Sequence, residues 1–310
     1  MISVIIPVYN EEESVSSLHA ELVSVLKGLG VDYEIIFVND GSTDETLAAL
    51  KTLHPVRVIS FVQNFGKSAA FAAGFKAARG ERVITMDGDL QNNPNDIPRL
   101  LAELDKGFDI AAGWRESRWK RSFFTRRLPS WVANWLISRM TGVKLHDHGC
   151  ALKAYKRSAL AHIELTEDMQ RMVAVQAALH GGRVSEIKID FRDRKFGKPK
   201  FGMSRFITVI LDLLNFYFFK KYARRSSHFF GMIGIWLLIG GFFMFLWALF
   251  LKVALGTNFV RTPLPIFTAI AVVVGFQFIF LGLLAEMIAR NRNDGDAKAS
   301  YIIREEIENK

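Results

Sequence analysis

Two carboxylates and a carboxamide follow the short apolar run 83–86. Asp87, Asp89 and Gln91 stand at alternate positions. Alternate side chains of an extended chain point to the same side, and the next loop allows Gln91 to turn its carbonyl toward the carboxylates. Such oxygen ligands suit Mg²⁺ or Mn²⁺, with substrate phosphate completing an open cage. The simpler interpretation is a turn whose polar side chains accept from backbone donors.

Two other apolar runs also end in polar residues. Residues 2–8 lead into Tyr9 and Glu11, and residues 33–38 lead into Asp40. In an open parallel sheet, ligands bind beyond the carboxyl ends of the strands. Tyr9 is suited to stack on a base, Asp40 to accept from a base N–H, and Glu11 to lie near a ribose. The three runs therefore predict a nucleotide site at one edge of a sheet.

The order and spacing of these segments resemble the family-2 glycosyltransferases of GT-A fold. The segments that carry the resemblance are Pro7-Val8-Tyr9-Asn10-Glu11, Asn39-Asp40-Gly41-Ser42, Asn64-Phe65-Gly66-Lys67, Asp87-Gly88-Asp89-Leu90-Gln91, Gly113-Trp114-Arg115 and the run from Arg194 to Lys200. Within the family, the pattern is most similar to the polyprenyl-phosphate glycosyltransferases, which include relatives of dolichyl-phosphate mannose synthase and bactoprenol glucosyltransferase.

The resemblance implies an α/β GT-A domain over 1–203, with a Rossmann-like, mostly parallel sheet, and assigns roles to its residues. The implied nucleotide-binding residues are Pro7, Tyr9, Glu11, Asp40, Lys67, Gly88, Arg194 and Lys200. Those implied for the acceptor phosphate are Arg115, Arg126, Arg127 and Asp147, and those for the metal are Asp87, Asp89 and Gln91. Asp89, Arg115, Arg126 and Asp168 are the expected catalytic residues. Pro199 departs from the family pattern, which usually has serine there.

Asp168 raises the question of the acceptor. The triplet Thr166-Glu167-Asp168 resembles one found in processive polysaccharide synthases. In those enzymes the triplet carries the general base that deprotonates a sugar hydroxyl. A hydroxyl acceptor needs a base, whereas a phosphate is already anionic. Because the chain lacks the Gln-x-x-Arg-Trp segment and the many spans of those synthases, we favour a phosphate acceptor. A hydroxyl acceptor with Asp168 as base, and a non-catalytic nucleotide-sugar-binding scaffold, remain the alternatives.

The C-terminal third predicts a membrane hairpin. Residues 229–251 carry no charge and, as a helix, would be about 34 Å long, enough for a bilayer core of about 30 Å. Residues 264–285 form a second such run. We therefore assign a two-span hairpin to 226–288 and a cytosolic tail to 289–310. Basic residues flank both outer ends, which places both termini and the catalytic domain on the cytoplasmic side of the inner membrane.

The formal net charge of +9 makes nucleic acid the first partner to consider. The basic residues cluster in 115–144 and 192–225, beside apolar segments, so we predict a membrane surface and anionic substrates instead. Residues 204–225 read as an amphipathic interfacial helix with a narrow polar stripe. The single cysteine, Cys150, excludes an internal disulfide. A homo-oligomer is compatible with this sequence, which does not identify the sugar, the base or the oligomeric state.

We therefore predict an enzyme that transfers a sugar, with inversion, from a nucleotide diphosphate sugar to polyprenyl phosphate. Mg²⁺ or Mn²⁺ is the expected cofactor. Neutralisation of the leaving diphosphate is the main electrostatic task of such a site.

Overall fold

The computed structural model describes residues 1–116, 134–135, 137–139, 141–161, 163, 172–193, 226–291 and 301–309. The chain divides into two units, residues 1–212 with 299–310 and residues 213–298. Several predictions lie outside the described residues: the interfacial helix at 204–225 and the site residues Arg126, Arg127, Asp168, Arg194 and Lys200.

The first unit is built on an eight-stranded sheet in the order β7-β5-β6-β4-β1-β2-β3-β8. The strands are β1 (Ile2–Val8), β2 (Tyr33–Asn39), β3 (Val56–Phe61), β4 (Arg82–Thr85), β5 (Ile110–Trp114), β6 (Lys153–Lys156), β7 (Val184–Lys188) and β8 (Ile303–Asn309). The four central strands β4, β1, β2 and β3 are parallel. β5 and β7 are parallel, whereas β6 and β8 run antiparallel to their neighbours. The predicted α/β architecture is confirmed, with a mixed sheet.

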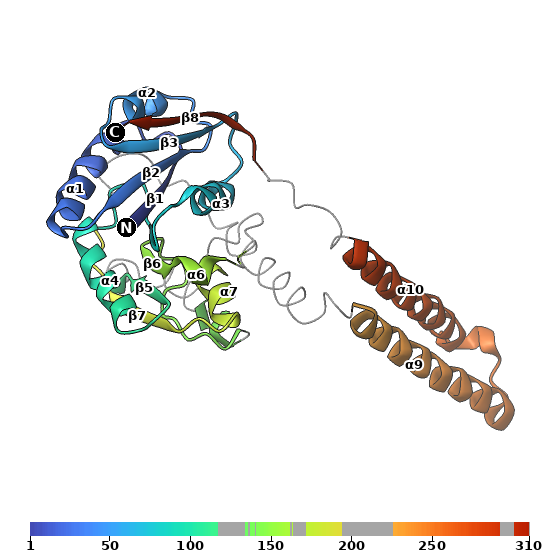
Figure 1. The fold of residues 1–310 in the computed structure, drawn as a ribbon. Helices are drawn as coiled ribbons and strands as arrows, with labels where there is room; N and C mark the ends of the chain where they lie inside the picture. Colours follow the sequence, from blue (N-terminus) through green and yellow to red (C-terminus); the bar gives the residue numbers. More distant parts are fainter. Residues whose placement is uncertain are drawn as a thin grey trace. The chain divides into compact units, whose positions relative to one another are not determined.

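Helices cover both faces of this sheet. They are α1 (Val15–Gly28), α2 (Thr46–Lys51), α3 (Lys67–Ala77), α4 (Ile97–Asp105), α6 (Arg157–Leu160) and α7 (Val173–Leu179), with the short η1 (Pro94–Asp96) before α4. Figure 1 shows α1 and α4 on one side of the sheet and α3, α6 and α7 on the other. The helices α1, α2, α3 and α4 connect strands that run in the same direction, which explains why the central strands are buried on both faces.

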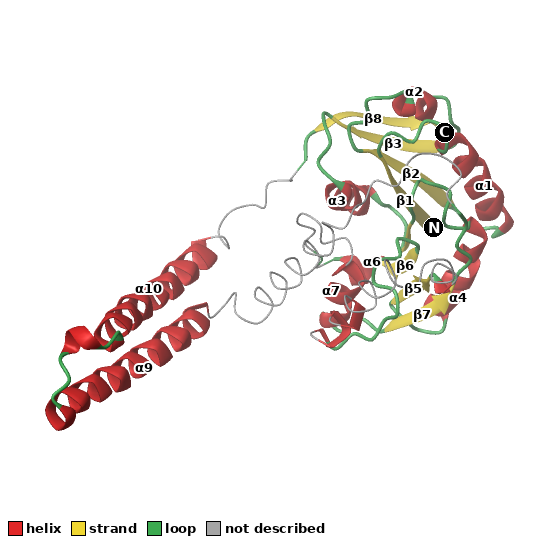
Figure 2. Ribbon diagram, turned by 180° about the vertical axis from the view of Figure 1, so that it is seen from behind, coloured by secondary structure: helices red, strands yellow, loops and turns green. Residues whose placement is uncertain are grey.

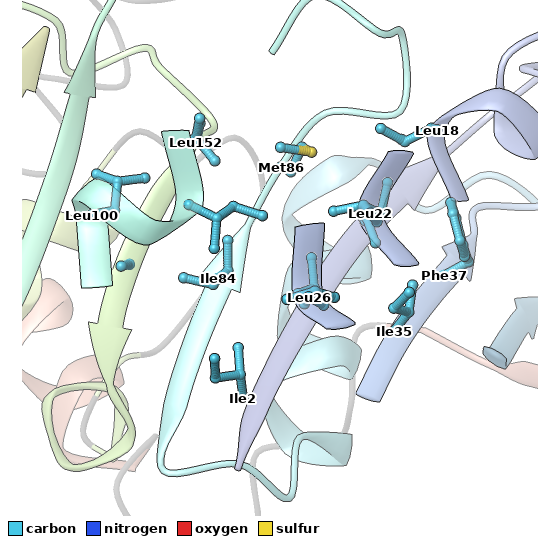
Figure 3. Close-up of a cluster of buried hydrophobic side chains, with 14 of the residues drawn as sticks. Ile2, Leu18, Leu22, Leu26, Ile35, Phe37, Ile84, Met86, Leu100 and Leu152 are labelled. Carbon is cyan, nitrogen blue, oxygen red and sulfur yellow. The ribbon is translucent and has the colours of Figure 1, made fainter. Parts of the chain in front are cut away.

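Strand β1 illustrates how the sequence positions this core. All seven residues of β1 are buried. Ile2, Val4 and Ile6 pack with α1 and α4, whereas Ile5 packs with α3 on the opposite face. Figure 3 shows part of the hydrophobic cluster between the sheet and helices α1 and α4, with Leu18, Leu22 and Leu26 at helical spacing on α1. The alternating directions along β1 therefore anchor helices on both sides of the strand whose end reaches the candidate site.

The second unit contains two long apolar helices, α9 (Ser226–Leu255) and α10 (Leu264–Asn291), joined through η5 (Phe259–Arg261). In the described part of the chain, these helices contain two stretches long and apolar enough to cross a membrane. Gly234 and Gly275 face each other across the pair, because a Cβ on Gly234 would lie 2.5 Å from the Gly275 carbonyl oxygen. Small residues allow such close packing of apolar helices. The predicted pair of possible spans is confirmed.

The chain then returns to the sheet. Residues 303–309, within the predicted cytosolic tail, form β8 antiparallel to β3 and close that edge of the sheet (Figure 2). The strand is rich in charge, and it forms ion pairs from Glu305 to Lys51 and from Glu306 to Arg57. Sequence analysis did not foresee this strand, since its residues lack a buried apolar run.

Candidate functional site

The carboxyl ends of β4, β1, β2 and β3 meet at one edge of the sheet, because these neighbouring strands run in the same direction. Pro7 lies in β1, and Tyr9 and Glu11 follow it, both half-buried. The backbone N–H of Glu11 donates to Thr46 Oγ1 at 2.8 Å, which ties this loop to the first residue of α2. The structure thus brings the predicted nucleotide-binding residues of the first two strands to a common edge.

Asp40 links the loops after β2 and β3. Its carboxylate accepts hydrogen bonds from the backbone N–H groups of Phe65 at 2.7 Å and Gly66 at 3.0 Å. Burial raises the pKa of Asp40, and these two N–H groups oppose that rise. Gly41 supports the same junction, since a Cβ there would lie 2.2 Å from the backbone carbon of Gln63. Asp40 therefore organises the loop that precedes α3, besides its predicted contact with a base.

Lys67 and Asp87 form an ion pair between the first residue of α3 and the loop after β4. Both side chains remain partly exposed, at 36% and 26%. The first N–H groups of a helix attract anions, and here an ammonium group is added to them. Two residues predicted for different roles, donor phosphate binding and metal binding, are thus neighbours.

The 87–91 loop differs in one respect from the expectation. β4 ends at Thr85, so both carboxylates lie in the loop, and strand alternation does not set their direction. Instead, Leu90 turns the chain with φ of +60°, an uncommon conformation for a residue with a branched side chain. The backbone N–H of Gln91 then donates to Asp89 Oδ1 at 3.2 Å. A tight turn, stabilised by the Asp89 carboxylate, thus brings Asp89 and Gln91 together.

The donor set fits a hard divalent cation that substrate phosphate helps to hold. Asp87 already binds a cationic group, Lys67, and Asp89 and Gln91 supply further oxygen atoms nearby. Gly88 lies close beneath β1, since a Cβ there would lie 2.7 Å from Val8 Cγ1. Among the described residues, no three His, Cys, Asp or Glu side chains form a metal site by themselves.

Arg115, predicted to steer the acceptor phosphate, is held by Asp147. Its Nε and Nη2 atoms donate to the two carboxylate oxygens at 2.7 and 2.9 Å, and both side chains are buried. Burial is the largest single effect and lowers the pKa of Arg115, but the charge and hydrogen bonds of Asp147, together with the charges of Cys150 and Asp87, outweigh it and the pKa is raised. The guanidinium also lies over the Phe191 ring at 5.3 Å. This bidentate geometry positions the pair rigidly beside the end of β5.

Two residues that sequence analysis missed support this pair. Glu186 on β7 accepts from the backbone N–H groups of His146 and Asp147 and from the His146 ring, at 2.7 to 3.0 Å. Lys153 is buried on β6, donates to the carbonyl of His148 at 3.0 Å, and has its pKa lowered by burial to about 8. Glu186 belongs to no local motif, so no signal in the sequence distinguishes it from surface charge.

A family model described as "Glycosyl transferase family 2" matches residues 3–164. The chain belongs to glycosyl transferase family 2. This membership confirms the family and the enzyme class that the sequence predicted, and the residues assembled at the strand ends lie mostly within the matched region.

Relatives of this glycosyltransferase match it over nearly its whole length. A dodecaprenyl-phosphate galacturonate synthase from Rhizobium johnstonii is 39% identical, with 98% of this chain and 92% of the relative covered. An undecaprenyl-phosphate 4-deoxy-4-formamido-L-arabinose transferase from Salmonella paratyphi B is 33% identical, with 99% and 93% covered. Both matches therefore include the apolar hairpin and the residues that follow it.

Solved structures support the fold of this glycosyltransferase. Glucosyl-3-phosphoglycerate synthase from Mycobacterium tuberculosis, crystallised with Mn²⁺ and UDP-glucose, aligns with a TM-score of 0.58 at 20% identity and covers 70% of this chain and 78% of its own. A second structure of that enzyme, with Mn²⁺, UDP and its glucosylated product, aligns with a TM-score of 0.56 at 22% identity, covering 69% and 80%. At this identity the likeness concerns the GT-A fold alone.

Proposed function

We propose that this glycosyltransferase moves a sugar from a nucleotide diphosphate sugar to a polyprenyl phosphate at the cytoplasmic face of the inner membrane. The observation that carries the proposal is the similarity, over almost the full length, to two enzymes named for prenyl-phosphate products. The polar strand ends and the two apolar helices agree with it, because the reaction joins a soluble anionic donor to a lipid acceptor.

The donor is bound where the four parallel strands end. Tyr9 stacks on the base, and Glu11 and Asp40 lie toward the nucleoside, with Pro7 and Gly88 allowing close approach. A Mg²⁺ or Mn²⁺ ion held by Asp87, Asp89 and Gln91 would neutralise charge on the diphosphate. Lys67 supplies a further positive charge at the N-terminus of α3, where backbone N–H groups also attract phosphate. Arg194 and Lys200 are proposed to approach the same diphosphate.

The acceptor phosphate attacks the anomeric carbon directly. Its oxygen is already anionic, so no side chain has to remove a proton as it attacks. The bond to the sugar forms on one face as the bond to the nucleotide diphosphate breaks on the other, which inverts the anomeric configuration. Arg126 and Arg127 are proposed to bind the acceptor phosphate. Arg115, held by Asp147, adds fixed positive charge beside that path.

The membrane arrangement follows from chain order. α9 and α10 form a hairpin whose two outer ends both lead back to residues of the catalytic unit. If both helices cross the bilayer, the segments before and after them lie on the same side. Basic residues before α9 and after α10 favour the cytoplasm as that side.

The decisive experiment is a transfer assay with the full-length enzyme. Membranes containing it are incubated with undecaprenyl phosphate and a panel of labelled nucleotide sugars, including the galacturonate and formamido-arabinose donors suggested by the relatives. The expected result is a labelled lipid product with at least one donor. Membranes without the enzyme are the control, and absence of product with every donor would contradict the proposal.

The same assay separates a phosphate acceptor from a hydroxyl acceptor. With a phosphate nucleophile, Arg126→Ala raises the acceptor requirement strongly, because a charge-assisted contact contributes about 1.5–3 kcal/mol, and Asp168→Asn has a much smaller effect. With a hydroxyl nucleophile the ranking reverses, because loss of a general base costs on the order of a hundredfold to ten-thousandfold. Transfer to dephosphorylated undecaprenol, abolished by Asp168→Asn, would favour the hydroxyl alternative.

A further inference from the structure

The segment that follows the second apolar helix packs against the end of β3. The Tyr301 ring stacks on the Phe61 ring, with centroids 4.9 Å apart and planes 19° apart. Phe61 in turn meets the Phe65 ring edge-on at 5.8 Å. Burial raises the pKa of Tyr301, consistent with a ring enclosed by this cluster. A row of three aromatic rings thus connects the C-terminal segment to the loop between β3 and α3.

The backbone of that loop is held by the same segment. The N–H of Val62 donates to the carbonyl of Ile302 at 3.1 Å. The guanidinium of Arg304 donates to the carbonyl of Val62, also at 3.1 Å. Val62 is the first residue after β3, so both of its backbone polar groups are satisfied by residues that lie some 240 positions later in the chain.

The loop that receives these contacts carries the donor-side groups of the candidate site. Phe65 and Gly66 provide the N–H groups that Asp40 accepts, and Lys67 binds Asp87. Removing the support at Phe61 and Val62 would therefore free a loop whose far end sets the position of Asp40 and Lys67. At the other end of β8, Glu308 pairs with Arg79 and lies opposite Arg57, near the start of β3 and not near its end.

We infer that Tyr301 and Arg304 are positioning residues for donor binding, through the loop 62–67. The inference rests on the proposed function in taking this loop as part of the donor site. It means that the element which closes the sheet after the membrane hairpin also sets the affinity for the nucleotide sugar. The segment 301–309, which follows the apolar hairpin, thus also supports the donor site. Loss of these residues weakens donor binding more than it slows the transfer step.

Variants of the full-length enzyme test this in steady-state kinetics. Tyr301→Ala is expected to raise the donor KM about three- to tenfold, the scale of one lost aromatic pair, with kcat and the acceptor KM little changed. Tyr301→Phe keeps the stacked ring, so its donor KM should equal that of the wild-type enzyme. Arg304→Ala should change it in the same direction. Glu308→Gln, at the opposite end of the same strand, is the matched control and should leave all three parameters unchanged.

Hydrogen exchange of the same proteins gives a readout that does not depend on activity. The amides of Phe65 and Gly66 are expected to exchange faster in Tyr301→Ala and Arg304→Ala, and at the wild-type rate in Tyr301→Phe and Glu308→Gln. Unchanged exchange of these amides in both alanine variants would overturn the inference, and so would an equal effect of Glu308→Gln. If the wild-type enzyme transfers no sugar from any donor, the proposed function fails, whereas the exchange result still decides this inference.

Discussion

Breaking the Arg115–Asp147 pair should destabilise the catalytic unit strongly. The two hydrogen bonds measure 2.7 and 2.9 Å, and the side chains are 8% and 5% exposed. Arg115→Met leaves the carboxylate of Asp147 buried without its main counter-charge. Removing one partner of a buried pair costs about 3–5 kcal/mol. For a unit of this size, about 2–4 °C of melting temperature correspond to each kcal/mol, so we expect a fall of roughly 6–20 °C.

A double-mutant cycle separates this pair from general packing. Thermal unfolding of wild type, Arg115→Met, Asp147→Asn and the double variant is followed in one detergent at one scan rate, because membrane proteins often unfold irreversibly. Residues in direct contact are coupled, so the double variant should lose much less than the sum of the two single losses. Disruption of both partners removes the uncompensated buried charge that each single variant leaves.

An exposed ion pair on the same domain provides the control. Arg82 and Asp105 lie 2.6 Å apart with side chains 42% and 57% exposed. Arg82→Met should change stability by less than about 1 kcal/mol, since solvent screens the pair. If Arg115→Met melted within 2 °C of wild type, a threshold taken from the roughly 2–4 °C expected per kcal/mol, the reasoning about burial would be refuted. Strict additivity of the two single changes would refute the coupling.

Two further predictions concern the candidate site. Asp89→Asn should keep the circular dichroism of the folded enzyme but lower turnover at least about a hundredfold, and full turnover of this variant or of wild type in excess EDTA would contradict the metal role. Burial lowers the pKa of Lys153 from its ordinary 10.5 to about 8, so between these pH values the unfolded chain binds a proton that the folded chain lacks. The stability of wild type relative to Lys153→Met should therefore rise by up to roughly 3 kcal/mol from pH 8 to pH 10.5, and a difference independent of pH would contradict the buried ammonium.

The sequence by itself determined the family, the strands that carry the site and the two apolar helices. These features depend on local patterns: an apolar run such as 2–8, a polar turn such as Asn39-Asp40-Gly41-Ser42, and an uncharged stretch such as 229–251. Local patterns are readable because periodicity and turn chemistry act between residues a few positions apart. The direction of Asp87 and Asp89 was the exception. Strand alternation would set it only if β4 continued through both residues, but β4 ends at Thr85.

Only the tertiary structure decided which partners these residues have. Arg115 is held by a carboxylate 32 positions away, and Asp40 by amides about 25 positions away. Val62 is held by Ile302, which directly precedes β8, and by Arg304 within β8, a strand that its charged sequence did not predict. Such contacts arise because parallel strands and a returning C-terminus bring distant segments to one edge of the sheet. The strength of these long-range contacts depends on how deeply the groups are buried and on the direction in which each donor points. Residue types and spacing along the chain do not determine either property.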